Sequence, residues 1–279
     1  MRSKDITFVT IQSEGGLLPP DILGRISDLS KDIPGLKPAD YHLPKGEKLN
    51  EAINRSWSRA RGLWEKFSEL RSKLQATSQG IKETRENLLL PLFQELGYGR
   101  LPRKETEDIE GKRYPVSHLW NQSPIHLLGC NIQLDKRTPG VAGAAQSSPH
   151  SMIQEYLNRS EEHLWGFLAN GLKLRVLRDN QSLVRQAYVE FDLESMFDGE
   201  VFSDFALLWL ICHQSRVEVE TGDECWLEKW MRLGQEQGIR ALEGLRDSVE
   251  QAIEALGEGF LRHPVNQDLK EKLRSGELD

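Results

Sequence analysis

The sequence predicts a mixed α/β core with helical segments added at both ends, and three observations lead to this prediction. Apolar residues recur at helical spacing over 47–75, 201–214 and 224–260. Between these segments lie short apolar runs that have the length of strands. The dipeptide Asn170-Gly171, with such a run on each side, is the strongest hairpin signal in the chain. We therefore expect an N-terminal arm and helical segment (1–80), an α/β core (81–194) and a C-terminal helical segment (195–279).

The regular elements are expected at definite places. Residues 1–45 are rich in Gly and Pro and predict an irregular arm with a short helix near 20–30. A helix over 82–96 should be kinked or broken by Pro91, and another should begin at Ser148-Pro149. The long helix after 224 could break near Gly234 and Gly238. The strand candidates are 114–119, 125–128, 132–134, 164–169, 172–177 and 185–193.

Composition sets limits on function. The chain has 279 residues and a formal net charge of −7, so any contact with DNA must come from local basic patches. Its three cysteines are far apart in the sequence, which is typical of reduced thiols in the cytoplasm. We identify no signal peptide and no apolar stretch long enough to cross a bilayer, so a cytoplasmic protein without a membrane partner is expected.

Motifs for bound cofactors are missing from the sequence. It has no GxGxxG or GxxxxGK[ST] pattern and no Asn-Pro-Pro-aromatic tetrad of adenine methyltransferases. The seven histidines and three cysteines lack the close spacing of zinc ligands. We therefore expect neither a metal site nor a cofactor in this chain.

One stretch has the layout of a metal-dependent nuclease of the PD-(D/E)xK type. Such enzymes hold Mg²⁺ with carboxylates on neighbouring strands, beside a lysine that acts on the attacking water. Here Pro124-Ile125-His126 takes the place of the Pro-Asp pair, and Asp135 is followed directly by Lys136, so that on a strand the two would point to opposite faces. The sequence thus predicts a degenerate nuclease-like core, with Asp135, Lys136 and Glu155 as weak catalytic candidates. Mg²⁺ would be needed only if that core were active.

Basic residues around the predicted hairpin could form a phosphate-binding patch. The alternative interpretation is ordinary charge at strand edges, which prevents aggregation. The candidates for DNA contact are Lys136, Arg137, Arg159, Lys173, Arg175, Arg178 and Arg185.

Five segments together resemble the N-terminal region of large bacterial adenine-specific DNA methyltransferases of restriction–modification and DISARM-type phage-defence systems. They are Pro91–Tyr98, Leu164–Asp179, Leu49–Asn54, Arg137–Gly143 and Ala187–Leu193. The resemblance implies a parent protein that uses S-adenosylmethionine, with a methyltransferase domain that follows 195–279 and lies outside this chain. It also implies double-stranded DNA and other subunits of a defence complex as partners.

Three functional hypotheses follow from the sequence. The first is a DNA-engaging or partner-docking module of such a methyltransferase, without catalytic activity of its own. The second is an active Mg²⁺-dependent DNA endonuclease domain. The third is a protein-interaction scaffold of a defence complex, which the acidic charge and the long helices favour.

Overall fold

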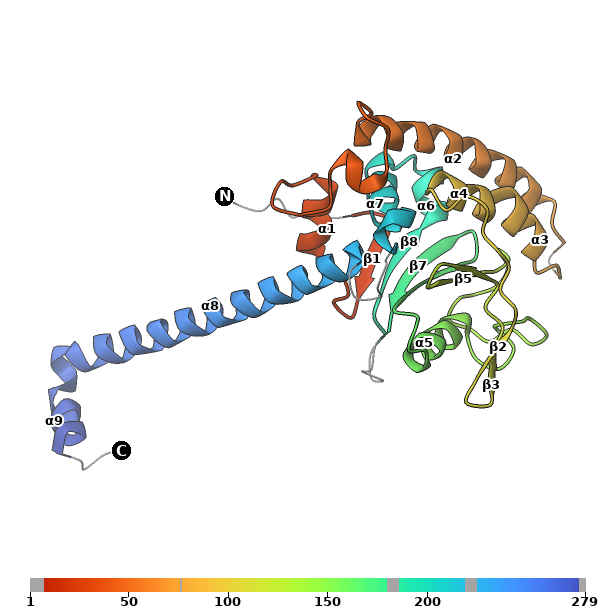
Figure 1. Cartoon of the computed structure of the whole chain (residues 1–279). Helices are drawn as coiled ribbons and strands as arrows, with labels where there is room; N and C mark the ends of the chain where they lie inside the picture. The colour runs from red at the N-terminus through yellow and green to blue at the C-terminus, as the bar shows by residue number, and fades with distance from the viewer. Residues whose placement is uncertain (1–7, 76, 180–185, 219–224, 276–279) are drawn as a thin grey trace. The chain divides into compact units, whose positions relative to one another are not determined.

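A six-stranded mixed sheet lies at the centre of the α/β core (Figure 1). The structure is a computed structural model, and it describes residues 8–75, 77–179, 186–218 and 225–275. The strands are β1 (Ile11–Glu14), β4 (His118–Trp120), β5 (Ser123–Leu127), β6 (Trp165–Ala169), β7 (Lys173–Arg178) and β8 (Tyr188–Asp192). Their order is β1-β8-β7-β6-β5-β4, and only β5 and β6 pair in parallel. A separate hairpin joins β2 (Glu107–Ile109) to β3 (Lys112–Tyr114), and the expected mixed α/β class is confirmed.

The predicted Asn-Gly hairpin connects β6 and β7. The Asn170 side chain accepts hydrogen bonds from the backbone N–H groups of Leu172 and Lys173, at 3.0 and 2.8 Å. Gly171 has a φ of +84°, and a Cβ there would lie 2.5 Å from Cγ2 of Thr84. A glycine is therefore needed at this turn both for backbone conformation and for close packing.

Helices cover both faces of the sheet. On one face, α5 (Pro149–Arg159) packs Met152 and Ile153 against Leu168 and Leu177. The neighbouring residue Phe167 points to the opposite face, where its ring meets that of Phe93 in α4 (Leu90–Glu95) at a centroid distance of 5.9 Å. The remaining helices of this part of the chain are α1 (Pro20–Ser27), η1 (Pro38–Tyr41), α2 (Leu49–Ser72), α6 (Leu193–Asp198), α7 (Phe202–Cys212) and η3 (Gln214–Arg216).

The helix around Pro91 changes its hydrogen-bond pattern before the proline. It consists of α3 (Ile81–Thr84), a π-helical turn η2 (Arg85–Leu89) and α4 (Leu90–Glu95). A proline cannot donate the backbone hydrogen bond of a regular helix, and a local π turn is one way to accommodate this without ending the helix. The helix is therefore not broken at Pro91, and a π turn precedes the proline within one continuous helical stretch.

The predicted helix start at Ser148-Pro149 is confirmed. The Ser148 hydroxyl accepts a hydrogen bond from the backbone N–H of Ser151 at 3.2 Å, and Pro149 occupies the first helical position.

Three predictions of local structure in the chain before α8 are wrong. Residues 132–134 form no strand. The side chains of Ile132 and Leu134 are buried against α5. Their backbone carbonyl oxygens accept hydrogen bonds from the Asn170 side chain and the His150 backbone N–H, and no partner strand is present there. The predicted strand over 114–119 is divided between the end of β3 and the start of β4. The N-terminal arm contributes β1, which pairs with the edge of β8.

The C-terminal part contains α8 (Trp226–Arg262), η4 (Pro264–Asn266) and α9 (Gln267–Ser275). The expected break near Gly234 and Gly238 is absent from α8, which runs on through both. By internal contacts the chain forms two units, Met1–Met231 and Arg232–Asp279. The functional division into 1–80, 81–194 and 195–279 stays a prediction. No helix in the described ranges combines the length and apolar character that crossing a membrane requires.

The hairpin glycine gives a test of this packing. Gly171→Ala should lower the free energy of unfolding by about 2–4 kcal/mol, because strain at positive φ adds to the clash with Thr84. Gly111→Ala is the matched control: its φ is +78°, but nothing lies within 4 Å of the added Cβ. Chemical denaturation of both variants should show a clearly larger loss for Gly171→Ala, and equal losses would contradict the close packing of the turn on Thr84.

Candidate anion-binding site

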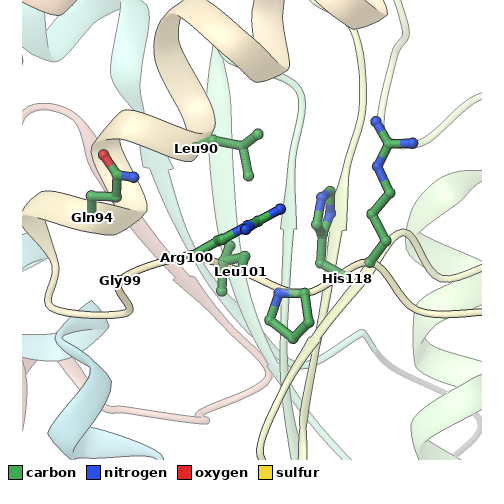
Figure 2. A pocket seen from close by; sticks show the side chains of 8 residues that line it. Leu90, Gln94, Gly99, Arg100, Leu101 and His118 are labelled. Atoms are coloured by element: carbon green, nitrogen blue, oxygen red, sulfur yellow. The ribbon is translucent and has the colours of Figure 1, made fainter.

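A cavity lined by basic side chains lies between the end of α4 and the start of β4. It has a volume of about 430 Å³, and Figure 2 shows the side chains of Arg100 and His118 extending into it. A second hollow of about 320 Å³ shares Leu90, Arg103 and His118 with the first, so the two adjoin. The second hollow adds Lys82 and Arg85 to the lining. We call Lys82, Arg85, Arg100, Arg103 and His118 the arginine site.

The π turn and the end of β5 position Arg85. Its guanidinium donates to the backbone carbonyl oxygen of Leu127 through Nε, at 2.7 Å, and through Nη2. Burial, followed by the positive charge of Arg103, lowers the pKa of Arg85. Arg85 remains charged, since a guanidinium does not lose its proton in a protein. A half-buried cation therefore faces another cation, and no carboxylate of the residues that the structure describes is its partner.

His118 lies at the start of β4 and is 3% exposed. Its Nδ1 is 2.9 Å from the Ser117 hydroxyl, which itself donates to the carbonyl oxygen of Ile125 at 3.1 Å. This network assigns the ring proton to Nδ1 and leaves Nε2 without a hydrogen in the neutral form. Burial, and then the charges of Arg85 and Arg103, lower the pKa of His118 to about 4, so the ring is neutral at pH 7.

Arg100 and Arg103 come from the polar segment that follows α4. Both are exposed, and neither makes a hydrogen bond or ion pair through its side chain with any described residue. The backbone of Arg103 forms an isolated antiparallel bridge with His118, which fixes the segment beside β4. Glu86 lines the second hollow, but it forms no ion pair with these cations within the described ranges.

The arrangement of these charges favours an anion in the cavity. Like charges held close together raise the local positive potential, and an anion that binds between them relieves this repulsion. Arginine side chains bind phosphate or carboxylate oxygens through paired N–H donors. The arginine site can therefore hold a phosphate group in spite of the net charge of −7 on the chain.

Several of the predicted DNA-binding residues belong to ion pairs within the fold. Arg175 is 2% exposed, and it donates to both carboxylate oxygens of Asp135 at 2.6 and 2.7 Å and to Glu190 at 2.5 Å. Its guanidinium also lies 4.4 Å from the ring centroid of Tyr188. Lys173 pairs with the other carboxylate oxygen of Glu190. A phosphate could reach Arg175 only by displacing these carboxylates.

Arg178 and Arg159 are also paired. Arg178 donates to both carboxylate oxygens of Glu228 at 2.8 and 3.0 Å. Arg159 pairs with Glu110 at 3.0 Å and with Glu155 at 3.4 Å. By contrast, Lys136 and Arg137 are exposed and have no side-chain partner among the described residues. Arg185 lies outside the described residues, so the structure gives no position for it.

The nuclease candidates are not assembled as metal ligands. The hydrogen bonds from Arg175 lower the pKa of Asp135 and occupy both of its oxygens. Burial raises the pKa of Glu155, but hydrogen bonds from Lys112 and Tyr114 bring it below its usual value. Across residues 8–75, 77–179, 186–218 and 225–275, no three His, Cys, Asp or Glu side chains form a group that could hold a metal ion.

Sequence reasoning did not single out the arginine site. Its members come from a helix, a polar loop and a strand, and they are brought together only by the fold. The local signal was only that Arg100 and Arg103 stand close together in the polar loop over 100–112. No protein-family model, curated protein or solved structure matches this chain.

The titration of His118 tests the charge of the site. An anion that binds beside the ring should raise its pKa from about 4, and the anion should bind more tightly as the pH falls from 7 towards 5. NMR titration of the ring with and without pyrophosphate measures both effects. If saturating pyrophosphate left the His118 titration unchanged, the anion would not lie in this cavity.

Proposed function

We propose that this chain is a DNA-engaging module without a catalytic site of its own, and that it contacts phosphate groups of DNA through the arginine site. The observation that carries the proposal is the group of cations around two adjoining hollows, which no carboxylate of the described residues neutralises. Phosphate contacts of this kind supply affinity and register on DNA without reading its sequence. The proposal places the main DNA contact at the arginine site, beside α4 and the start of β4, and not at the hairpin of β6 and β7.

Two of the residues expected from the sequence can extend this contact. Lys136 and Arg137 are exposed and carry charges that no described carboxylate neutralises. The other basic residues near the hairpin already stabilise the fold through ion pairs. We therefore assign DNA contact to the arginine site first, and to Lys136 and Arg137 second.

The setting of this function rests on the sequence resemblance alone. On that ground we propose an adenine-specific DNA methyltransferase of restriction–modification or DISARM-type phage defence as the parent protein. S-adenosylmethionine would bind to the methyltransferase domain of that parent, and no residue of this chain is assigned to it. Other subunits of a defence complex are proposed as partners, and the cytoplasm as the location.

The salt dependence of DNA binding tests the proposed contact. Arg100→Gln with Arg103→Gln should weaken binding of duplex DNA by about tenfold or more, because charge-assisted hydrogen bonds are lost. The slope of log K against log salt concentration should also fall by about 1 for each phosphate contact removed. Fluorescence anisotropy across a salt series measures both quantities.

Arg55→Gln is the matched control for this experiment. Arg55 is an exposed arginine on α2 that pairs with Glu47, away from the arginine site. Its variant should bind DNA like the wild type, apart from the small effect of one charge on the net balance. Because the control removes one charge and the double variant two, an equal loss of binding free energy per charge removed would show that binding follows total charge and would contradict a defined phosphate contact.

The absence of nuclease activity is a separate prediction. Supercoiled plasmid should remain intact with this chain and Mg²⁺ or Mn²⁺, because Arg175 occupies the carboxylate of Asp135. The measurement is gel electrophoresis after prolonged incubation, with Asp135→Asn as the companion variant. Metal-dependent cleavage that disappears in a folded Asp135→Asn protein would establish the endonuclease hypothesis instead.

A further inference from the structure

One side of α8 exposes a row of large apolar side chains. Their exposed fractions lie between 49% and 73%. They belong to the unit Arg232–Asp279, in which the described residues offer no core to cover them. The row consists of Ile239, Leu242, Leu245, Val249, Ile253, Leu256 and Phe260.

The spacing of these residues is that of a coiled coil. Written as heptads, Ile239, Ile253 and Phe260 take position a, and Leu242, Val249 and Leu256 take position d. Arg246 is the polar exception at a, and Leu245 lies beside the seam at position g. Such a repeat buries its apolar side chains against a second helix of the same periodicity.

We infer that a second copy of this chain covers the row, with the two α8 helices packed as an antiparallel two-stranded coiled coil. This inference is independent of the proposed DNA contact. The residues that flank the seam carry the argument, because they differ in size and charge on its two sides.

The g flank is small and apolar. It contains Gly238, Leu245, Ala252 and Gly259, and a Cβ at either glycine would meet nothing within 4 Å. In an antiparallel pair the two g flanks face each other. If Ile239 of one copy is level with Leu256 of the other, Leu245 lies over Ala252 of the second copy and Gly238 faces Gly259. The large side chain of Leu245 then meets a small one, and two glycines leave the end of the flank free of steric conflict.

The e flank carries charge. It contains Glu243 and Glu250, and in the same alignment Arg246 of each copy lies within about one residue of the level of Glu250 of the other. Two ion pairs can therefore form around the two-fold axis, and they offset the repulsion between Glu243 of one copy and Glu250 of the other, which approach each other on this flank. A parallel pair would instead stack Arg246 on Arg246 and place Leu245 beside Glu250, which leaves like charges and an apolar group against a carboxylate.

The oligomeric state of the full chain tests the inference. The seam spans about three heptads, so we expect a dimer that dissociates on dilution. At a protein concentration on the order of 100 μM, sedimentation equilibrium should give a dimer for the wild type and a monomer for Leu242→Glu with Ile253→Glu. Ser248→Glu with Gln251→Glu lies on the same helix outside the seam and should remain dimeric. A monomeric wild type, or equal behaviour of both double variants, would overturn the inference.

Cross-linking tests the orientation. Glu250→Cys should be joined to its copy by a short bis-maleimide much more efficiently than Glu243→Cys, because along the axis of this antiparallel pair the two copies of residue 250 lie about 8 Å apart and those of residue 243 about 14 Å apart. The native Cys130, Cys212 and Cys225 are buried, and the wild type serves as the blank. Equal cross-linking at 243 and 250 would indicate a parallel pair, and none at either position would overturn the proposed register.

Discussion

The hydrogen bonds from Arg85 to the carbonyl oxygen of Leu127 fix the geometry on which the candidate site depends. They tie the π turn before Pro91 to the end of β5, the strand that pairs with the His118 strand. The carbonyl accepts the donors of Arg85 but does not neutralise its charge. A half-buried cation is thus held without a carboxylate partner among the described residues. Its charge lowers the pKa of His118, and the charge of Arg103 lowers the pKa of Arg85.

The rest of the sheet treats charge in the opposite way. Arg175 satisfies its donors with Asp135, Glu190 and His150, and Arg178 is paired with a carboxylate that is itself buried. Removing one partner of such a buried pair leaves the other without compensation, so these groups are constrained to stabilise the fold. Arginines whose donors are bonded to carboxylates, such as Arg175 and Arg178, therefore stabilise the fold. Arg100 and Arg103, which pair with no carboxylate of the described residues, can bind a ligand.

Local patterns determined which parts of the fold could be predicted. The Asn170-Gly171 turn, the cap at Ser148 and the periodicity of α2 each depend on neighbours in the sequence. The run over 132–134 has the length of a strand, but its residues pack under α5 and no partner strand is formed there. A short apolar run cannot distinguish these outcomes, because the difference lies in contacts with distant residues.

The candidate sites depended even more on distant contacts. The basic residues near the hairpin were visible in the sequence, whereas the carboxylates that engage them come from β8, α5 and α8. The arginine site is assembled from three separated elements, so no spacing rule predicts it. In α8 the helix itself was predictable, but only the structure shows that its apolar face is left exposed.

We therefore propose above all that an anion occupies the space between Arg85, Arg100, Arg103 and His118. Isothermal titration calorimetry of pyrophosphate into the wild type and into Arg103→Gln tests it most directly. We expect a single site in the wild type, and an affinity for pyrophosphate that is lower by at least about tenfold in the variant. No binding to the wild type, or equal binding to both proteins, would contradict it.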